Sequence, residues 1–151
     1  MRRLAALFLA LTVLGAAPVG ARAPQPIRAR GGEGAVAVVR AYYAALAERD
    51  YRRAYALWGD DGRASGKSFA AFAAGLVRTA RTDVAIGRPG EPEGAAGSTY
   101  IEIPVTVRAR LRDGTRQRFA GRYTLRRVND VPGSSAKERR WHIYSARLRA
   151  R

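Results

Sequence analysis

The segment that most constrains the fold is residues 38–58, VVRAYYAALAERDYRRAYALW, which carries two successive amphipathic patterns. In the first, large side chains recur at the i, i+3, i+4, i+7 spacing of one helical face, namely Val39, Tyr42, Tyr43 and Leu46. The second repeats the spacing with Tyr51, Ala54, Tyr55 and Trp58. Asp50 stands between them as an N-cap, and Gly59 is expected to end the second helix in a left-handed conformation. The segment therefore predicts two short helices joined by a tight turn, with aromatic residues gathered on one side.

One more helix and then a series of strands follow this pair. Residues 65–77 have a helical pattern that Ser65 can cap, with Phe69, Phe72 and Leu76 on the apolar face. A strand is expected at residues 82–87, a turn-rich connection at 88–97, and a loop at 129–138. Residues 100–111 alternate strictly between apolar and polar, which is typical of a strand with one buried face. Strands at residues 117–125 and 140–148 complete the expected sheet.

Asp113 and Gly114 mark a hairpin between the two long strands. A two-residue loop would place arginines on the same face as the aromatic residues of the second strand. A three-residue loop, with Gly114 in the left-handed bulge position, pairs residue 111 with residue 115 and makes one face wholly apolar. Because a slip of one residue inverts every side chain, burial favours the three-residue loop. This register places Arg108 opposite Arg118 and Arg110 opposite Arg116 on the polar face.

The chain begins with the features of a secretory signal peptide. Arg2 and Arg3 precede an apolar run at residues 4–14, and small residues follow up to position 23. The run is too short to span a bilayer. We expect residues 1–23 to form the signal peptide and the first 21–23 residues to be removed, with cleavage after Ala21 favoured. The product is expected to be a periplasmic or secreted protein that meets the membrane only through the cleaved peptide. Residues 24–33 are predicted to be a flexible leader, and residues 34–151 a single domain.

The order of these patterns resembles the nuclear transport factor 2-like domains, also called ketosteroid isomerase-like or SnoaL-like. The matching stretches are VVRAYYAAL, RDYRRAYALW, IEIPVTV, the DGT hairpin and RRWHIYSARL, and they extend over residues 34–149. The resemblance implies an α+β fold in which three N-terminal helices pack in a strongly curved, cone-shaped antiparallel sheet. Pro104, inside a predicted strand, fits an edge or a bulge of such a sheet. The resemblance also implies a pocket between helices and sheet, which aromatic residues would line: Tyr42, Tyr55, Trp58, Phe72, Tyr123 and Trp141.

Isomerase members of this family use an acidic base deep in the cone, and no such residue is recognisable here. Asp83 and Glu102 both fall on the outward face of predicted strands. The single histidine, His142, is the remaining candidate for a general base, but no carboxylate stands at a spacing that would orient it. One histidine and no cysteine predict neither a metal site nor a disulfide, and no motif for a cofactor occurs.

Positive charge is concentrated in the second half of the chain. The formal net charge is +16, and residues 108–151 hold 14 basic and three acidic groups. Arg108, Arg110, Arg116 and Arg118 are expected to share one sheet face, where like charges directly opposite are unfavourable. One interpretation is an anion-binding face for an envelope component or an acidic protein, with no nucleic acid expected. The other is composition bias, because arginine outnumbers lysine 26 to 2.

Three hypotheses follow. The first is an exported, non-catalytic binding or accessory domain, with an aromatic pocket for a small apolar ligand and a basic sheet face. The second is a small-molecule isomerase or dehydratase, with His142 as base and Tyr123 or Tyr55 as hydrogen-bond donor. The third is an oligomerising module, such as a homodimer, that packs through its sheet face. A buried ionisable pair inside the cone distinguishes the enzyme from the others.

Overall fold

A computed structural model describes residues 28–151 of the protein. The predicted signal peptide and the first part of the predicted leader lie outside the described residues. Four helical elements come first: α1 (Arg28–Ala47), α2 (Tyr51–Ala56), the 3-10 helix η1 (Asp60–Ser65) and α3 (Phe69–Leu76). The strands follow: β1 (Thr79–Ile86), β2 (Glu93–Ala95), β3 (Ser98–Leu111), β4 (Arg116–Val128) and β5 (His142–Ala150).

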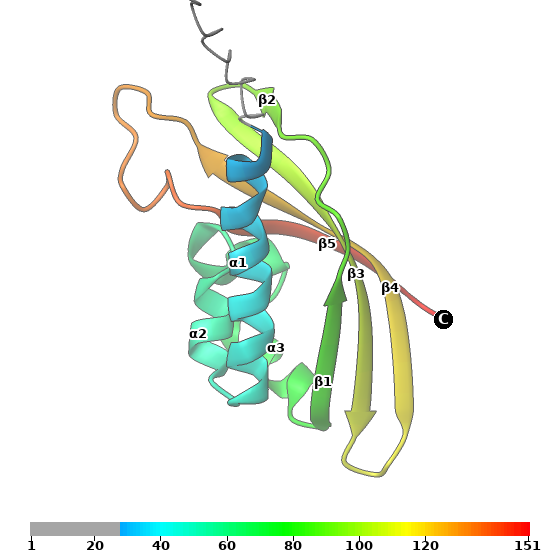
Figure 1. Cartoon of the computed structure of the whole chain (residues 1–151). Helices are drawn as coiled ribbons and strands as arrows, with labels where there is room; N and C mark the ends of the chain where they lie inside the picture. Colours follow the sequence, from blue (N-terminus) through cyan, green and yellow to red (C-terminus); the bar gives the residue numbers. More distant parts are fainter. Residues whose placement is uncertain (1–27) are drawn as a thin grey trace, which may run out of the picture.

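These strands form one antiparallel sheet in the order β1-β3-β4-β5, with β2 paired to β3. The sheet is strongly curved, and the helices all lie on its concave side (Figure 1). The predicted α+β class, with three α-helices packed in a curved antiparallel sheet, is confirmed. None of the helices in residues 28–151 is both long enough and apolar enough to cross a bilayer.

The first two helices follow the predicted pattern, with one correction at the start. Val39, Tyr42 and Tyr43 are buried, and the Asp50 carboxylate accepts a hydrogen bond from the backbone N–H of Arg53 at 3.0 Å. However, α1 begins at Arg28, so residues 28–33 are helical although they were predicted to belong to a flexible leader. Glycines disfavour a helix, but packing against the sheet can outweigh this preference. Gly32 is buried, and a Cβ there would lie only 3.6 Å from the Ile101 side chain.

Two predicted helix ends are wrong, and tertiary contacts explain the first of them. Gly59 has a φ of −59° and is not left-handed. Its N–H donates to the carbonyl of Ile143 at 2.9 Å, so the chain after α2 runs beside β5 before it forms η1. Helix α3 is capped by Ser68, whose hydroxyl accepts from the Ala71 N–H at 3.2 Å, and not by Ser65. Ser65 instead accepts the N–H of Lys67 within the turn between η1 and α3.

The β3–β4 hairpin has the predicted three-residue loop. Gly114 has a φ of +89°, and the Leu111 N–H donates to the Thr115 carbonyl at 2.9 Å. As predicted, Ile103 pairs with Tyr123 and Val107 with Phe119. The inner face of the sheet is therefore apolar, and its most deeply buried side chains are Ile101, Ile103, Leu125 and Ile143. Other strand ends shift: β1 starts at Thr79, β5 ends at Ala150, and β2 lies in the predicted connection.

Pro104, which has no N–H, and Gly121, which has no side chain, each suit a particular position in the sheet. Pro104 lies in β3 between the end of pairing with β1, at Val105, and the start of pairing with β2, at Tyr100. This is an edge position, where the missing N–H costs no ladder bond. Gly121 lies in β4 where the backbone of β5 comes so close that a Cβ would collide with the carbonyl of Arg147. The bend brings β5 across the concave side toward the helices (Figure 1).

Candidate functional site

Five aromatic side chains form the centre of the layer between helices and sheet. This aromatic cluster consists of Tyr42, Tyr43, Trp58, Phe72 and Tyr123, which are 3–7% exposed. Their ring centroids lie 5.2–6.5 Å apart, mostly in edge-to-face geometry. Such contacts are typical of a packed aromatic core. Four of the six predicted pocket residues belong to this cluster.

The remaining two predicted pocket residues lie at or beyond its border. Tyr55 contacts Phe72 at 5.3 Å between ring centroids, and its hydroxyl donates to the Lys67 carbonyl at 2.8 Å. Trp141 lies apart from the cluster, against Gly34 of α1 and under the guanidinium of Arg127 at 5.1 Å. None of the six lines either of the two cavities described for this structure. Binding of a ligand by these residues stays a prediction, since the rings of the cluster pack on one another.

The aromatic cluster also buries polar atoms. The hydroxyls of Tyr43 and Tyr123 are hydrogen-bonded at 2.8 Å. Burial raises the pKa of both tyrosines, and that of Tyr42, above the ordinary value, because an ionised phenolate loses its hydration there. The indole Nε1 of Trp58 is buried without a hydrogen-bond partner of good geometry among the described residues, although an interaction with Trp58 offsets part of the rise in the pKa of Tyr42. The interior of the described chain thus holds neutral donors and no carboxylate.

Asp83 and Glu102, which were predicted to lie on the outward face of their strands, are exposed. Asp83 is paired with Arg81 at 2.9 Å, which holds the pKa of Asp83 below its usual value. Glu102 is paired with Arg122 at 2.9 Å. No group of three or more metal-ligating side chains occurs among the described residues.

The outer, convex face of the sheet carries a row of arginines. Arg108 pairs with Arg118 and Arg110 with Arg116, as the hairpin register predicted. Two more arginines reach this face from β5, because Arg147 pairs with Arg122, and Arg149 with Ala120. Sequence reasoning missed these two, since the register of the last strand has no local signal. Six exposed arginines of this face form no ion pair with any described residue. We call them the outer arginine set: Arg108, Arg110, Arg116, Arg118, Arg147 and Arg149.

A groove of about 980 Å³ opens at the start of β5. Its walls come from η1, the end of β4, the loop at residues 129–141 and the first residues of β5. The loop projects beyond the sheet on the side of η1 (Figure 1), and the ammonium of Lys137 is ion-paired there with the carboxylate of Asp61. No local pattern in the sequence indicates this groove, because segments far apart in the chain form it: Asp61 and Lys137 are separated by 76 residues.

His142 lines the groove and is half-buried. Its Nδ1 lies 2.9 Å from the carbonyl of Arg140, which can only accept, so Nδ1 carries the proton and Nε2 has the free lone pair. Burial lowers the pKa of His142, which keeps the ring neutral near pH 7. Neither Tyr123 nor Tyr55 lines this groove, so the proposed pairing of His142 with a tyrosine donor is not assembled.

Comparison with known proteins supports the fold. No family model matches the chain, and no curated protein matches it in sequence. A conserved protein from Planctomyces limnophilus has a similar structure, with a TM-score of 0.56, 14% identity, and coverage of 80% of this chain and 98% of that one. The Kfla4162 protein from Kribbella flavida has a TM-score of 0.51 and 15% identity, with coverage of 81% and 91%.

A third similar structure is a proposed dehydratase of the NTF2-like family from Streptomyces avermitilis. Its TM-score is 0.49 at 12% identity, with coverage of 78% of this chain and 93% of that one. At these identities a structural likeness speaks for fold and not for activity. With three α-helices on the concave side of a strongly curved antiparallel sheet, the chain has the α+β architecture that its resemblance to nuclear transport factor 2-like domains implied, and the first two of these structures share its fold.

Proposed function

We propose that the protein is an exported, non-catalytic binding domain that holds an anionic partner on the outer face of its sheet. The partner would be an anionic component of the cell envelope or an acidic protein. The observation that carries the proposal is the outer arginine set, six exposed guanidinium groups on one sheet face without an ion pair to any described residue. Export is expected from the signal peptide features at residues 1–23.

The arrangement of these charges suits a ligand with repeated anionic groups. Neighbouring strands lie about 4.8 Å apart, and residues two apart on one strand about 6.8 Å apart. The cross-strand pairs Arg108–Arg118 and Arg110–Arg116 therefore form a closely spaced block of positive charge. Like charges directly opposite destabilise a strand pair, and an anion bound there would relieve this repulsion. Composition bias explains arginine in place of lysine, but not the scarcity of acidic residues in this half of the chain.

The interior supports a binding domain better than an enzyme. The carboxylates at Asp83 and Glu102 are exposed and ion-paired, so the described residues provide no acidic base inside the cone. An apolar ligand would enter the aromatic cluster only by displacing rings that pack on each other. The third hypothesis, face-to-face association of two copies, would bring two outer arginine sets together, which their charge opposes.

The test is thermal unfolding of the mature protein with long-chain polyphosphate, with heparin, and with uncharged dextran. We expect both polyanions, but not dextran, to raise the melting temperature, because a ligand that binds the folded state stabilises it. The gain should shrink in Arg110→Gln/Arg118→Gln. It should also shrink with added salt, since exposed charges are screened over about 8–10 Å at ordinary ionic strength.

The matched control is Arg40→Gln/Arg52→Gln, which removes the same charge from exposed positions of the helical layer. This control should keep the full gain. If the wild type gains nothing, or if both double variants respond alike, the outer arginine set has no anionic partner.

A further inference from the structure

The groove at the start of β5 has properties that the outer arginine set does not explain. We propose that it binds a small organic carboxylate with an apolar body. Its volume of about 980 Å³ is at the upper end of the range for small-molecule sites, roughly 300–1,000 Å³. The groove contains no member of the outer arginine set, so ligand binding in the groove is independent of the proposed function and can be tested separately.

The charges that line the groove leave an excess of positive charge. Asp60 is held by Arg63 through two hydrogen bonds of 2.8 and 3.1 Å. Asp61 is ion-paired with Lys137. Two lining cations, Arg126 and Arg127, form no ion pair with any described residue. The charges of these two guanidinium groups are therefore not fully compensated, although Glu138 lies near enough for Arg126 to help lower the pKa of its carboxyl.

The third lining carboxylate, Glu138, is satisfied within its own loop. Its Oε2 accepts from the N–H and the hydroxyl of Ser135 at 2.8 and 2.7 Å, and these bonds lower the pKa of Glu138. These bonds hold the carboxylate on its own loop, and among the described residues it forms no ion pair with Arg126 or Arg127.

Arg126 is positioned in advance. Its Nε and Nη2 donate to the Oγ of Ser98 at 3.1 and 3.0 Å, and Ser98 is only 2% exposed. A guanidinium has five N–H donors, so about three remain for a ligand. The planar group matches a carboxylate through two parallel hydrogen bonds, and a guanidinium already held in place loses less entropy on binding.

His142 is the cross-strand partner of Arg126 and lies on the same wall. Its Nε2 lone pair would repel an anion while neutral, but would become a donor on protonation. The charged groups around the ring are Asp61 of η1, Lys137 and Arg140 of the loop, and Arg126 of β4. A carboxylate bound beside Arg126 would therefore favour the protonated imidazole.

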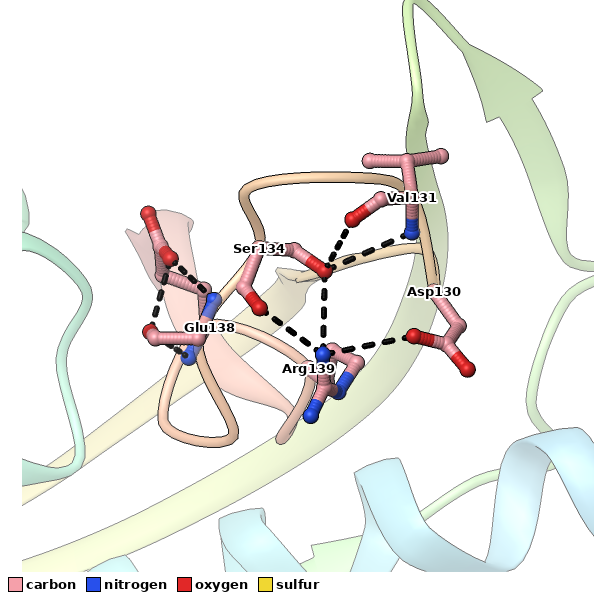
Figure 2. Close-up of polar contacts among 6 residues, drawn as sticks. Asp130, Val131, Ser134, Glu138 and Arg139 are labelled. Atoms are coloured by element: carbon pink, nitrogen blue, oxygen red, sulfur yellow. Dashed lines mark hydrogen bonds and ion pairs between the residues drawn. The ribbon is translucent and has the colours of Figure 1, made fainter.

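The other walls supply a fixed shape and an apolar surface. Figure 2 shows the loop as a hydrogen-bonded unit: the Arg139 guanidinium donates to Asp130 at 3.3 Å and to the Ser134 carbonyl at 2.8 Å, and the Ser134 hydroxyl donates to the Val131 carbonyl at 2.7 Å. Ala64 and Tyr144 also line the groove, together with Ile143, whose own side chain is buried in the core. Ala64 and Tyr144 suit the apolar body of a ligand whose carboxylate lies at Arg126.

The experiment uses benzoate as the probe and benzamide as its uncharged counterpart. His142 is the single histidine of the chain, so its imidazole proton signals are assigned without ambiguity in an NMR titration of the mature protein. We expect benzoate to shift these signals saturably and to raise the pKa of His142. Benzamide should bind at least tenfold more weakly, and benzoate should bind more tightly as the pH falls through the range where His142 protonates.

Arg126→Gln and Arg127→Gln test the guanidinium groups separately. Each should weaken benzoate binding, with at least a tenfold loss for Arg126→Gln, while Arg40→Gln on the exposed side of α1 should change nothing. Arg127 is exposed, so its variant remains informative if the half-buried Arg126 variant unfolds. No saturable shift, equal binding of benzamide, or unchanged binding in both groove variants would overturn the proposal, while leaving the polyanion test of the outer face unaffected.

Discussion

The hydroxyls of Tyr43 and Tyr123 lie 2.8 Å apart in the core, although the two residues are separated by 80 positions in the chain. This hydrogen bond joins α1 to β4 at the centre of the aromatic cluster. Each hydroxyl is hydrogen-bonded to the other, and both side chains are at most 7% exposed.

Removing one of these hydroxyls should therefore cost more stability than half of the loss caused by removing both. Tyr43→Phe leaves the Tyr123 hydroxyl buried without its partner, and a buried unsatisfied group costs about 1–3 kcal/mol. We expect Tyr43→Phe/Tyr123→Phe to lose less stability than the sum of the two single variants. Urea denaturation of the four proteins measures this coupling. Strict additivity would show that the two hydroxyls do not depend on each other.

Burial of tyrosines predicts a loss of stability in alkali. The folded pKa of Tyr42, Tyr43 and Tyr123 is raised above the unfolded value of about 10. For such groups the stabilisation is fully present below the unfolded pKa and is lost as the pH rises above it, because the unfolded chain releases protons more readily. The free energy of unfolding should therefore fall above about pH 10. The fall should be less steep in Tyr42→Phe, and an unchanged slope there would contradict the assignment for that residue.

Trp58 allows packing and hydrogen bonding to be separated. Because its ring is buried in the aromatic cluster, Trp58→Ala should cost about 3–5 kcal/mol. Trp58→Phe keeps an aromatic ring and removes the Nε1–H that has no hydrogen-bond partner of good geometry among the described residues, so its cost should be at most about half as large. Denaturant midpoints of the two variants decide this. A small cost for Trp58→Ala would indicate a hollow beside the ring, as the pocket prediction required.

The hairpin offers a test of backbone conformation. Gly114 has a φ of +89°, and a Cβ there would meet no other atom within 4 Å. Any loss of stability must then come from the backbone alone. Gly114→Val should be clearly destabilising and Gly114→Asn milder, because asparagine tolerates the left-handed region better than a β-branched residue. Equal melting temperatures for the two variants would argue against this loop.

Local patterns in the sequence were sufficient for much of the fold. The spacing of Val39, Tyr42 and Tyr43 predicted the buried face of α1, because a helix repeats every 3.6 residues wherever it packs. The alternation in residues 100–111 predicted the register of the β3–β4 hairpin, because only one register buries every apolar side chain. The same register placed Arg108 and Arg118 together on the outer face.

Only the tertiary structure decided which distant residues meet. Whether the aromatic rings would line a hollow or pack together depended on how the sheet and the helices meet, and the backbone of β5 comes close at Gly121 because this residue has no side chain. Trp141 lies against α1 at Gly34, directly after the helical residues 28–33 that were predicted as a leader. The groove joins η1 to a distant loop, through Asp61 and Lys137, which are 76 residues apart in the chain. The periodicity of a sequence indicates which side of a helix or strand is buried. Which other element that side packs against depends on contacts between distant segments, and such contacts leave no local pattern in the chain.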